Sequence, residues 1–540
     1  MYPLGFLPFF CALVPYPVAI AAALTIPVLV LVLWAYAVIP RRYAACAAPD
    51  AHTAPVHLPG TSVTHILPFF HRRFDFLNDG FRLAGQAVYQ FRLLRTPVIV
   101  LSGEDARRDF FQARDLDLNA GFRFLSGAIP MVPGVTSDLE SRRISLIHRR
   151  LTASQSSDRL ARLIPQILED SRQTISAWGC SGSIDPFERI SEVLFQTTVR
   201  CLAFTELADD RAAVMHLKTL YDTLDTATTP ATVLLPWLPG PSMLRRLVAT
   251  KRIYDIISRT LDARTASGVA RDDTPQMLID AGDERLVIIG FIMGLLVAGA
   301  RSTGTTASWL VTFLSGHPYW REKAAEEVRR LIAVHATAPT NPPPLSDLST
   351  TLASVPLAAW ETETPVLDAL VRETLRVAEP HVAMRQYIPS SSSSRSPSPA
   401  RAGEKARPQV QPLYIGGKVV PPGAFVMYPF ADVHLDENVY ADPWRWDPSR
   451  AETGSKAPYA YVGMGAGATV CLGKRLATLE LKLVAALLVL GCGEFRAVDG
   501  NGMPLAELPR PNWNDILTCR PAKGAVFVRF DRARDGAAAR

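Results

Sequence analysis

The hydrophobic and polar positions of this 540-residue chain follow a helical period over much of its length. Apolar residues recur every three to four positions in several long stretches, which predicts helices there. These stretches are 157–178, 190–204, 285–314 and 366–377. The stretch 285–314 begins polar and then stays apolar, so we expect it to cross the core as one long helix. Short strands are predicted at 98–101 and, as a pair around a turn, between Leu413 and Tyr428. The pattern therefore predicts a mainly α fold with minor β.

The first 40 residues contain no charged side chain. Within them the apolar run 18–39 has the ~20 residues that a membrane-spanning helix needs. A cleavable signal peptide would have a basic start and a shorter apolar core. Arg41 and Arg42 follow directly, which predicts that the rest of the chain is cytosolic. We expect residues 1–40 to be an N-terminal anchor in the endoplasmic reticulum membrane, 41–60 a linker and 61–540 the folded domain.

Two stretches interrupt the folded domain. Residues 337–365 contain three consecutive prolines, 342–344, and few periodic apolar positions. Residues 389–411 are of low complexity, rich in Ser and Pro. Such a segment buries too little apolar surface to offset its ordering entropy, so we expect a surface insertion there.

Composition excludes several classes of protein. A net charge of +6 over 540 residues is too mild to predict nucleic-acid binding. The seven cysteines form an odd, scattered set with no C-x-x-C pair. This set favours neither a disulfide framework nor a zinc site, and it is typical of a reducing compartment.

Cys471 ends a glycine-rich loop and directly precedes an apolar helical stretch. Gly463, Gly465 and Gly467 remove side chains where a backbone has to lie close to something large and flat. The amides at the start of the following helix are expected to favour the thiolate form of Cys471. A single anionic sulfur on a loop suits the axial position of a haem iron.

Two other interpretations of this loop remain open. Gly463, Gly465 and Ala468 also fit the G-x-G-x-x-A pattern that binds a dinucleotide pyrophosphate. That pattern follows a hydrophobic strand, whereas residues 451–458 are polar loop formers, and it gives Cys471 no role. The loop could also be a structural turn beside a buried free cysteine.

A possible support for the loop lies about a hundred residues earlier. Glu373 and Arg376 are three residues apart in a helical stretch, so their side chains share one face and can pair. Arg450 follows in the motif Trp-Asp-Pro-Ser-Arg. An isolated pair of this kind is common on solvated helices, but the order of the pair, Arg450 and the cysteine loop gives it weight.

With these motifs, the chain resembles the cytochrome P450 superfamily, of the membrane-anchored fungal type, over about residues 60–530. Gly467, Cys471 and Gly473 match the family's cysteine loop. Met464 stands at its aromatic position, and Thr469 replaces its basic residue.

The resemblance implies a P450-like fold, with haem between a long central helix and the cysteine-bearing loop. Cys471 would be the metal ligand, that is, the axial ligand of the iron of haem b (heme b). Gly467 and Gly473 would shape the cofactor-binding loop, and Glu373, Arg376 and Arg450 would form the buried trio that supports it.

The family's propionate-binding residues have only partial counterparts here. The W-x-x-x-R motif of an early helix lacks its Trp, which leaves His148 and Arg149 as candidates. Arg385, in the segment after the Glu373–Arg376 helix, is the other candidate. Since Thr469 supplies no charge, these residues would have to bind the propionates.

The oxygen-activating helix also departs from the family pattern. Ala298 and Gly299 fit a helix that passes close to an iron-bound ligand. The acid of the pattern is replaced by Arg301, and Ser302 followed by Thr303 stands where the hydroxyl residues belong. By resemblance Ser302 and Thr303 are the catalytic candidates, whereas an arginine cannot deliver protons.

The resemblance implies an oxidoreductase of secondary metabolism, a monooxygenase that inserts one atom of dioxygen into an apolar small molecule. The stretch after Cys471 is too short for flavin domains, so a separate NADPH-cytochrome P450 reductase is the expected partner. Lys474 and Arg475, with Arg142, Arg143 and Arg150, could form a basic docking surface for it. Substrate-pocket segments are expected at 122–135, 228–244, 293–302, 381–384 and 517–519.

Two alternatives remain beside this function. Some haem-thiolate relatives isomerise or dehydrate peroxides without a reductase, and the changes at residues 301 and 302 favour that chemistry. A haem-binding protein without catalytic activity is the other alternative.

Overall fold

The computed structural model describes residues 52–126, 141–336, 345–389, 413–451, 457–521 and 526–532. The predicted membrane anchor, most of the linker and the Ser/Pro-rich insertion from residue 390 lie outside these residues. The helices are α2 (Ile66–His71), α3 (Arg73–Ala84), α4 (Glu104–Gln112), α5 (Leu118–Ser126), α6 (Ser141–Ser154), α7 (Ser157–Ser176), α8 (Pro186–Leu202), α9 (Thr205–Asp209), α10 (Arg211–Thr226), α11 (Pro230–Leu234), α12 (Pro241–Ser267), α13 (Thr274–Asp280), α14 (Arg285–Gly316), α15 (Pro318–His335), α16 (Leu345–Ala353), α17 (Leu357–Thr362), α18 (Pro365–Ala378), α19 (Ala431–His434) and α20 (Lys474–Gly491).

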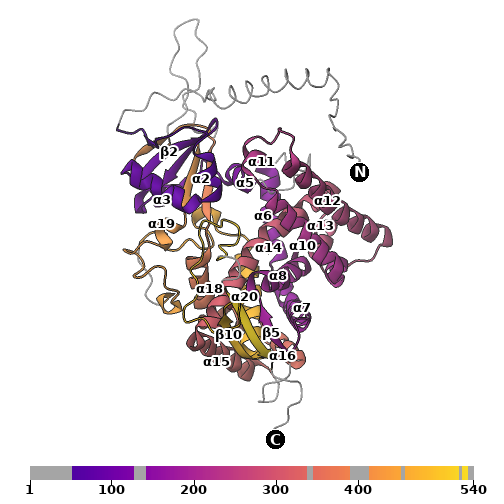
Figure 1. Cartoon of the computed structure of the whole chain (residues 1–540). Helices are drawn as coiled ribbons and strands as arrows, with labels where there is room; N and C mark the ends of the chain where they lie inside the picture. Colours follow the sequence, from indigo (N-terminus) through magenta and orange to yellow (C-terminus); the bar gives the residue numbers. More distant parts are fainter. Residues whose placement is uncertain are drawn as a thin grey trace, which may run out of the picture.

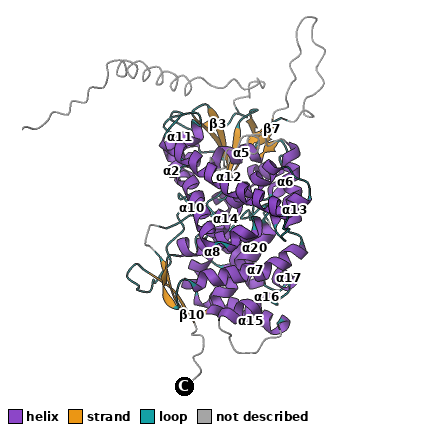
Figure 2. Cartoon of the chain, turned by 90° about the vertical axis from the view of Figure 1, so that its right-hand side faces the viewer, coloured by secondary structure: helices purple, strands orange, loops and turns teal. Residues whose placement is uncertain are grey.

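Helices form most of the molecule and the strands form three small sheets. A six-stranded sheet has the order β1-β2-β3-β9-β6-β4, a three-stranded sheet β10-β11-β5, and β7 pairs with β8. The strands are β1 (Val56–His57), β2 (Val88–Leu93), β3 (Thr96–Leu101), β4 (Leu116–Asp117), β5 (Ser181–Ile184), β6 (Val382–Tyr387), β7 (Leu413–Ile415), β8 (Lys418–Val420), β9 (Phe425–Pro429), β10 (Cys492–Val498) and β11 (Phe527–Arg532). The large sheet and the β10-β11-β5 sheet lie at opposite ends of the molecule (Figures 1 and 2).

The predicted long core helix is α14, which passes among the other helices near the middle of the molecule (Figure 2). Every residue from Thr303 to Ser315 is buried. Its hydroxyls bond back to carbonyls one turn earlier, as in Thr312 Oγ1 to Ser308 O at 2.7 Å, so polar side chains are satisfied inside the core. Among the described residues, α14 alone has the length and hydropathy to cross a membrane, and it lies in the protein interior.

Two predictions of local structure are wrong. Residues 337–365 are not a stretch without structure: α16 and α17 form within them, with Leu348, Leu352 and Trp360 buried. Their apolar positions do recur with a helical period, but the neighbouring prolines mask it. The region from Leu413 to Tyr428 contains three strands rather than two, because residues 421–423 (Pro-Pro-Gly) interrupt it after β8.

Candidate active site

Cys471 lies in the turn between a short 3₁₀ helix, Gly467–Thr469, and the start of α20. Its backbone N–H donates to Met464 O at 2.7 Å, which closes the loop. The side chain of Cys471 is exposed, and so are those of its neighbours Val470 (44%) and Leu472 (43%). Three consecutive side chains, one thiol and two aliphatic groups, are therefore accessible on this loop.

The glycines of the loop are required by the protein itself. Gly465 and Gly467 have φ of 75° and 59°, a left-handed region that favours glycine. A Cβ on Gly467 would lie 2.4 Å from Phe111 O, and one on Gly463 would lie 2.4 Å from the Tyr461 hydroxyl. At Gly467 and Gly463, α4 and the Tyr461 ring leave no room for a side chain, and the contact of this loop with a flat group stays a prediction.

The electrostatic environment of the thiol differs from the expectation. The protein around the accessible thiol partly desolvates it and thereby raises the pKa of Cys471, and this effect outweighs the hydrogen bond from Gly473 N–H and the charge of Lys474. The predicted thiolate character from the helix start is therefore wrong for the protein groups alone. A coordinating metal ion deprotonates a thiol outright, so an iron ligand at this position does not need a lowered pKa.

Glu373, Arg376 and Arg450 come together in the interior. Arg376 donates from Nε and Nη2 to the two carboxylate oxygens of Glu373 at 2.8 and 2.7 Å, a bidentate pair that is almost completely buried. Arg450 Nε lies 3.4 Å from Glu373 Oε1. The same carboxylate oxygen accepts from Asp447 N–H at 2.9 Å, so the pair is satisfied on all sides.

This trio is connected to the segment before the cysteine loop. Arg376 Nη1 donates to His434 O at 2.6 Å, and the His434 Nε2 accepts from Val462 N–H at 3.0 Å. The Arg376 guanidinium also lies 4.7 Å from the centre of the Tyr440 ring, and the Tyr440 hydroxyl donates to Ala460 O at 2.8 Å. Two continuous chains of contacts thus run from α18 to residues 460–462, where the loop begins.

Arg385 extends from β6 to the cysteine loop. Its Nη1 donates to Phe110 O at 2.7 Å, and its Nη2 donates to the hydroxyl of Thr469. The side chain is 1% exposed, and its Nε has no partner among the described residues. Burial lowers the pKa of Arg385 to about 10, so it stays charged at neutral pH. A buried cation with an unused donor therefore lies where the loop lacks its usual basic residue.

The early-helix candidates are placed differently. His148 and Arg149 on α6 are both exposed, and no hydrogen bond joins either to another described residue. Their neighbour Arg150 is bound to Asp283 by two hydrogen bonds of 2.8 Å. The structure thus leaves His148 and Arg149 accessible without bringing them into contact with Arg385 or the loop.

A further support of the loop, Gln155, has no recognisable pattern in the sequence. Gln155 follows α6, and its side chain is buried. It donates to Leu472 O at 2.8 Å and accepts from Leu476 N–H at 3.2 Å. The Gln155 amide thereby fixes the backbone on both sides of the junction between Cys471 and α20. A single Gln has no sequence pattern that would indicate this role.

The two catalytic candidates on α14 have different surroundings. Ser302 is exposed, and its hydroxyl donates to Ala298 O at 3.1 Å; Ala298 is exposed as well. Thr303 is 5% exposed and lies on the buried side of the helix. Gly299 packs against α8, since a Cβ there would lie 3.2 Å from Leu202 and from Thr198. Only Ala298 and Ser302 form an accessible strip on this otherwise buried stretch.

Arg301, which replaces the family's acid, is bound to α10. Its Nε donates to Asp225 Oδ2 at 3.1 Å, and its Nη2 forms an ion pair with the same carboxylate. Burial lowers the pKa of Arg301 to about 10, so it remains protonated at neutral pH. The arginine thus joins α14 to α10 and points its charge at Asp225.

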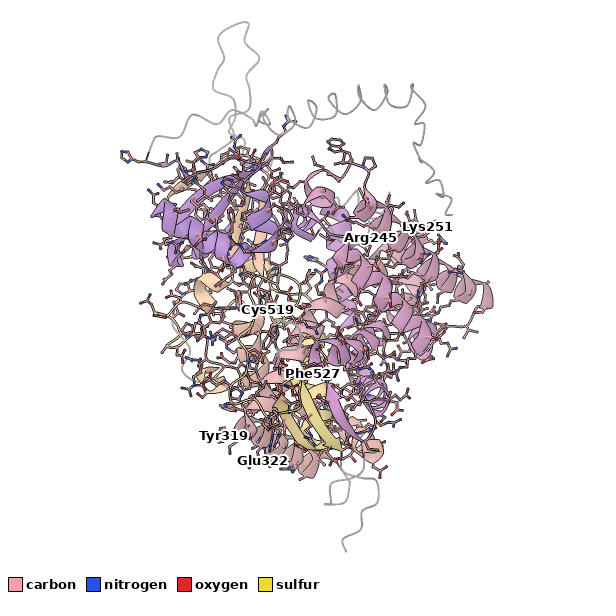
Figure 3. All side chains as sticks on the ribbon, in the orientation of Figure 1. Arg245, Lys251, Tyr319, Glu322, Cys519 and Phe527 are labelled. Atoms are coloured by element: carbon pink, nitrogen blue, oxygen red, sulfur yellow. The ribbon has the colours of Figure 1, made fainter. Side chains whose placement is uncertain are left out.

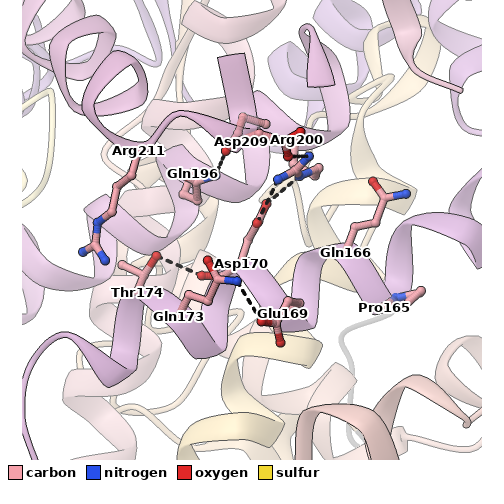
Figure 4. Close-up of a pocket in the computed structure, with 11 residues that line it drawn as sticks. Pro165, Gln166, Glu169, Asp170, Gln173, Thr174, Gln196, Arg200, Asp209 and Arg211 are labelled. Carbon is pink, nitrogen blue, oxygen red and sulfur yellow. Dashed lines mark hydrogen bonds and ion pairs between the residues drawn. The ribbon is translucent and has the colours of Figure 1, made fainter. Parts of the chain in front are cut away.

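A pocket of about 450 Å³ lies elsewhere, between α7, α8 and α9 (Figure 4). Its buried polar groups satisfy one another: Arg200 donates to Asp170 at 2.7 Å and to Asp209 at 2.7 Å. The pocket therefore offers a ligand few unpaired polar groups, and it contains none of the predicted site residues.

These features fit a haem. The accessible thiol and aliphatic side chains of the loop suit an iron and the groups around it. The small accessible residues of α14 suit the face of a macrocycle. The unsatisfied Nε of buried Arg385 suits an anionic propionate. A dinucleotide site would need a strand before the glycines, and the described residues 457–462 form none.

Comparisons with known proteins agree with this fit. The family described as Cytochrome P450 matches residues 404–493. The chain is 26% identical to the cytochrome P450 monooxygenase AacuE of Aspergillus aculeatus, over 82% of this chain and 86% of that protein. It is 28% identical to the cytochrome P450 monooxygenase dmxR5 of Cryptosporiopsis sp., over 77% and 78%.

An animal enzyme and a solved structure are also similar to this chain. The lanosterol 14-alpha demethylase of Bos taurus is 26% identical, over 81% of each chain. The retinoic acid bound cyanobacterial CYP120A1 has a TM-score of 0.66 at 20% identity, and the match covers 90% of this chain and 100% of that one. This likeness shows the fold, mainly helical with minor sheet. On the family match, these relatives and the fold, the chain belongs to the cytochrome P450 superfamily and is one of its monooxygenase enzymes.

Proposed function

We propose that this enzyme binds haem b through Cys471 and inserts one atom of dioxygen into an apolar small molecule, with electrons from a separate NADPH-dependent reductase. The observation that carries the proposal is the accessible Cys471 loop, supported through the buried Glu373–Arg376 pair. When bound, a haem with a thiolate ligand supplies the electron donation that favours cleavage of the O–O bond.

The residues of the chain would divide the work of binding the haem. Cys471 supplies the sulfur ligand, and Val470 and Leu472 supply aliphatic contacts. Arg385 is the main partner for a propionate, because its buried Nε has an unused N–H. His148 and Arg149 remain accessible for the second propionate.

Ser302 is the proposed proton-handling residue. Its hydroxyl donates to Ala298 O and its lone pairs are free to accept from a water molecule. Because Arg301 is paired with Asp225 and stays charged, it neither supplies nor takes protons. Protons would therefore reach Ser302 through water rather than through an acid at position 301. The accessible Ser302 hydroxyl supports the monooxygenase, whereas the loss of the acid at position 301 still fits the peroxide-using alternative.

The side chains of Arg142 and Arg143 lie outside the described part of the structure, and among the described residues the basic surface proposed for the reductase is smaller than the sequence suggests. Arg150 is paired with Asp283, and Arg475 is paired with Glu361, so both charges are neutralised within the chain. Lys474 is exposed and has no ion-pair partner among the described residues. We propose Lys474 as the cation available to an acidic redox partner beside the cysteine loop.

We also propose that the enzyme lies on the endoplasmic reticulum membrane through residues 1–40. Exposed apolar side chains gather at one end of the molecule and would be covered by lipid. They come from α2, the α11–α12 connection and the start of α12 (Figures 1 and 2). These side chains are Leu67 (64% exposed), Trp237 (47%), Leu244 (64%) and Leu247 (53%).

The test of the haem assignment is an absorption spectrum of the dithionite-reduced protein under carbon monoxide. Wild type is expected to show the strongly red-shifted Soret band of a thiolate ligand, and Cys471→Ser to lose it. Cys180→Ser, a change at another exposed cysteine, is the matched control and should retain the band. An unchanged band in Cys471→Ser would refute the ligand assignment.

The reaction class is tested separately. With reductase, NADPH and ¹⁸O₂, product should carry one labelled oxygen atom. Turnover of an organic peroxide without reductase, and no labelled product from ¹⁸O₂, would instead favour the isomerase or peroxide-using alternative. Absence of both activities in protein with a full thiolate spectrum would favour a non-catalytic haem binder.

A further inference from the structure

Arg73, the first residue of α3, is a buried cation without a counter-charge. Its side chain is 5% exposed, and its Nη2 has no hydrogen-bond partner. Its Nε donates to Phe69 O at 3.3 Å, and the guanidinium lies 4.5 Å from the centre of the Phe69 ring. Among the described residues no carboxylate lies within ion-pair distance of Arg73, although burying an uncompensated charge costs several kcal/mol.

The start of α3 lies against the segment that borders the accessible strip of α14. Asp75 N–H donates to Asn514 Oδ1 at 3.2 Å, and the ring centres of Phe74 and Trp513 are 5.9 Å apart. The same loop lies across α14, because Leu517 O accepts from the Thr305 hydroxyl at 3.4 Å, one turn beyond Ser302. Cys519, which follows, lies near the middle of the molecule, whereas Arg245 and Lys251 of α12 lie at its edge (Figure 3).

His381 is close enough to Arg73 for the charge of Arg73 to act on its imidazole. It directly precedes β6, and it is exposed although both neighbours in sequence are buried. Its ring nitrogens have no hydrogen-bond partner among the described residues. The surrounding protein, which partly desolvates the imidazole, and the nearby charge of Arg73 lower the pKa of His381 to about 4, so the imidazole is neutral and can donate one hydrogen bond. The His381 ring lies 4.9 Å from the ring of Phe430, centre to centre, and the next residue, Val382, packs in the same hydrophobic cluster as Phe69, on which Arg73 lies.

The nearby carboxyl group of Glu379 does not neutralise the charge of Arg73. Glu379 forms no ion pair with Arg73, and burial raises the pKa of Glu379 to about 7. The propionate candidate Arg385 is four residues from His381, roughly 13 Å along an extended strand. Arg73 and His381 are therefore at the far end of this strand from the cysteine loop.

We propose that Arg73 and His381 bind an anionic oxygen group of the substrate, a carboxylate or an ionised phenol, while the apolar body of the substrate extends towards Ser302. The inference rests on the proposed function, since it assigns the substrate of that site. Arg73 supplies the charge and a free N–H, and His381 supplies a second donor. The substrate is then an apolar molecule with one anionic end rather than a wholly apolar one.

The test measures binding by calorimetry, which needs neither turnover nor a haem signal. The probes are decanoate and 2-naphthoate, each compared with its methyl ester, and 4-nitrophenol compared with its methyl ether. We expect wild type to bind at least one anion at least tenfold more tightly than its neutral partner. The carboxylates and the phenol distinguish the two sources of the anionic group.

Substitutions at Arg73 and at the neighbouring Arg72 test whether Arg73 binds the anionic group. Arg73→Gln should abolish the preference for the anion, Arg73→Lys should retain part of it, and Arg72→Gln, a change at the exposed neighbouring arginine, should leave it intact. No preference in wild type, no binding of any probe, or an unchanged preference in Arg73→Gln would overturn the proposal.

A loss of haem from Arg73→Gln would also overturn it, because Arg73 would then serve the cofactor. The carbon monoxide spectrum of wild type, recorded beforehand, tests the proposed function independently. Thermal unfolding of Arg73→Gln should show a melting temperature no lower than that of wild type, since an uncompensated buried charge is removed.

Discussion

The Nη2 of Arg385 donates a hydrogen bond to the hydroxyl of Thr469, which itself donates to Ala466 O at 3.1 Å. A strand residue and a loop residue thus share the position that a basic side chain of the loop would otherwise fill. The charge comes from the strand, and the loop contributes an acceptor that orients it. Neutral Thr469 is therefore compatible with an anion-binding site at this loop.

Arg385→Gln should lower haem occupancy at least several-fold, because the variant lacks the charge for a propionate. Thr469→Ala is the matched change, since it removes the acceptor and leaves the cation, and it should lower occupancy much less. Haem per protein, from absorbance and total iron, measures both. Equal losses in the two variants would indicate a structural role for the hydrogen bond alone.

Glu373→Ala should prevent stable folding of the region around Arg376 and Arg450 that supports the cysteine loop. Arg376 would keep its buried charge without its partner, at a cost of about 3–5 kcal/mol. Thermal unfolding and haem content of the purified protein check this prediction. Glu437→Ala, at an exposed residue of the same region, is the control and should behave as wild type. Full haem occupancy in Glu373→Ala would contradict the supporting role.

Changing Ser302 and Thr303 singly to Ala should have different effects on coupling and on stability. Ser302→Ala removes the accessible hydroxyl, so product formed per NADPH consumed should fall roughly tenfold or more while hydrogen peroxide rises. Thr303→Ala alters the buried helix face and should lower the melting temperature with coupling unchanged. Parallel assays of NADPH, product and peroxide measure the coupling. Loss of coupling in Thr303→Ala but not in Ser302→Ala would show that Thr303 is the proton-handling residue.

Glu480 gives a pH-dependent stability. It is fully buried on α20 and accepts from the Thr197 hydroxyl at 2.8 Å, and burial raises its pKa to about 8. In the unfolded chain a Glu titrates near 4.3, so between pH ~4.3 and 8 only the folded state holds the proton. Stability should therefore fall as pH rises through this window, by up to ~1.4 kcal/mol per pH unit.

Glu480→Gln keeps the shape without the titration, so its stability should decline less between pH 5 and 8. Denaturant unfolding at several pH values measures the difference. Glu507→Gln, at an exposed position, should keep the wild-type slope. Identical slopes for wild type and Glu480→Gln would show that Glu480 titrates normally.

Local periodicity was sufficient for the main helices, because their apolar faces are regular in sequence. The predicted core helix and α14 agree within two residues. The same method failed for α16 and α17, which are short and follow a proline run, since turn-forming residues obscure a period of only two turns. The third strand after Leu413 was missed for a similar reason.

The candidate site was recognisable only where it is local in sequence. Cys471 with its glycines, and Glu373 with Arg376, are short-range patterns. The partners of Arg385 and Gln155 lie on distant segments, so nothing near them in the sequence indicates the contacts. Arg301 could be recognised as a departure, but its pairing with Asp225 depends on how α10 packs against α14.

The close approach of Gly467 to Phe111 has a consequence for the order of assembly. The loop is fixed by backbone contacts to α4 and, through Gln155, to the end of α6, segments that precede it by more than 300 residues. Contacts so distant in sequence form late, because the chain entropy of closing such long loops opposes them. The sulfur therefore reaches its final position only after nearly the whole chain has been synthesised and has folded, and a cofactor captured there would complete the fold rather than nucleate it.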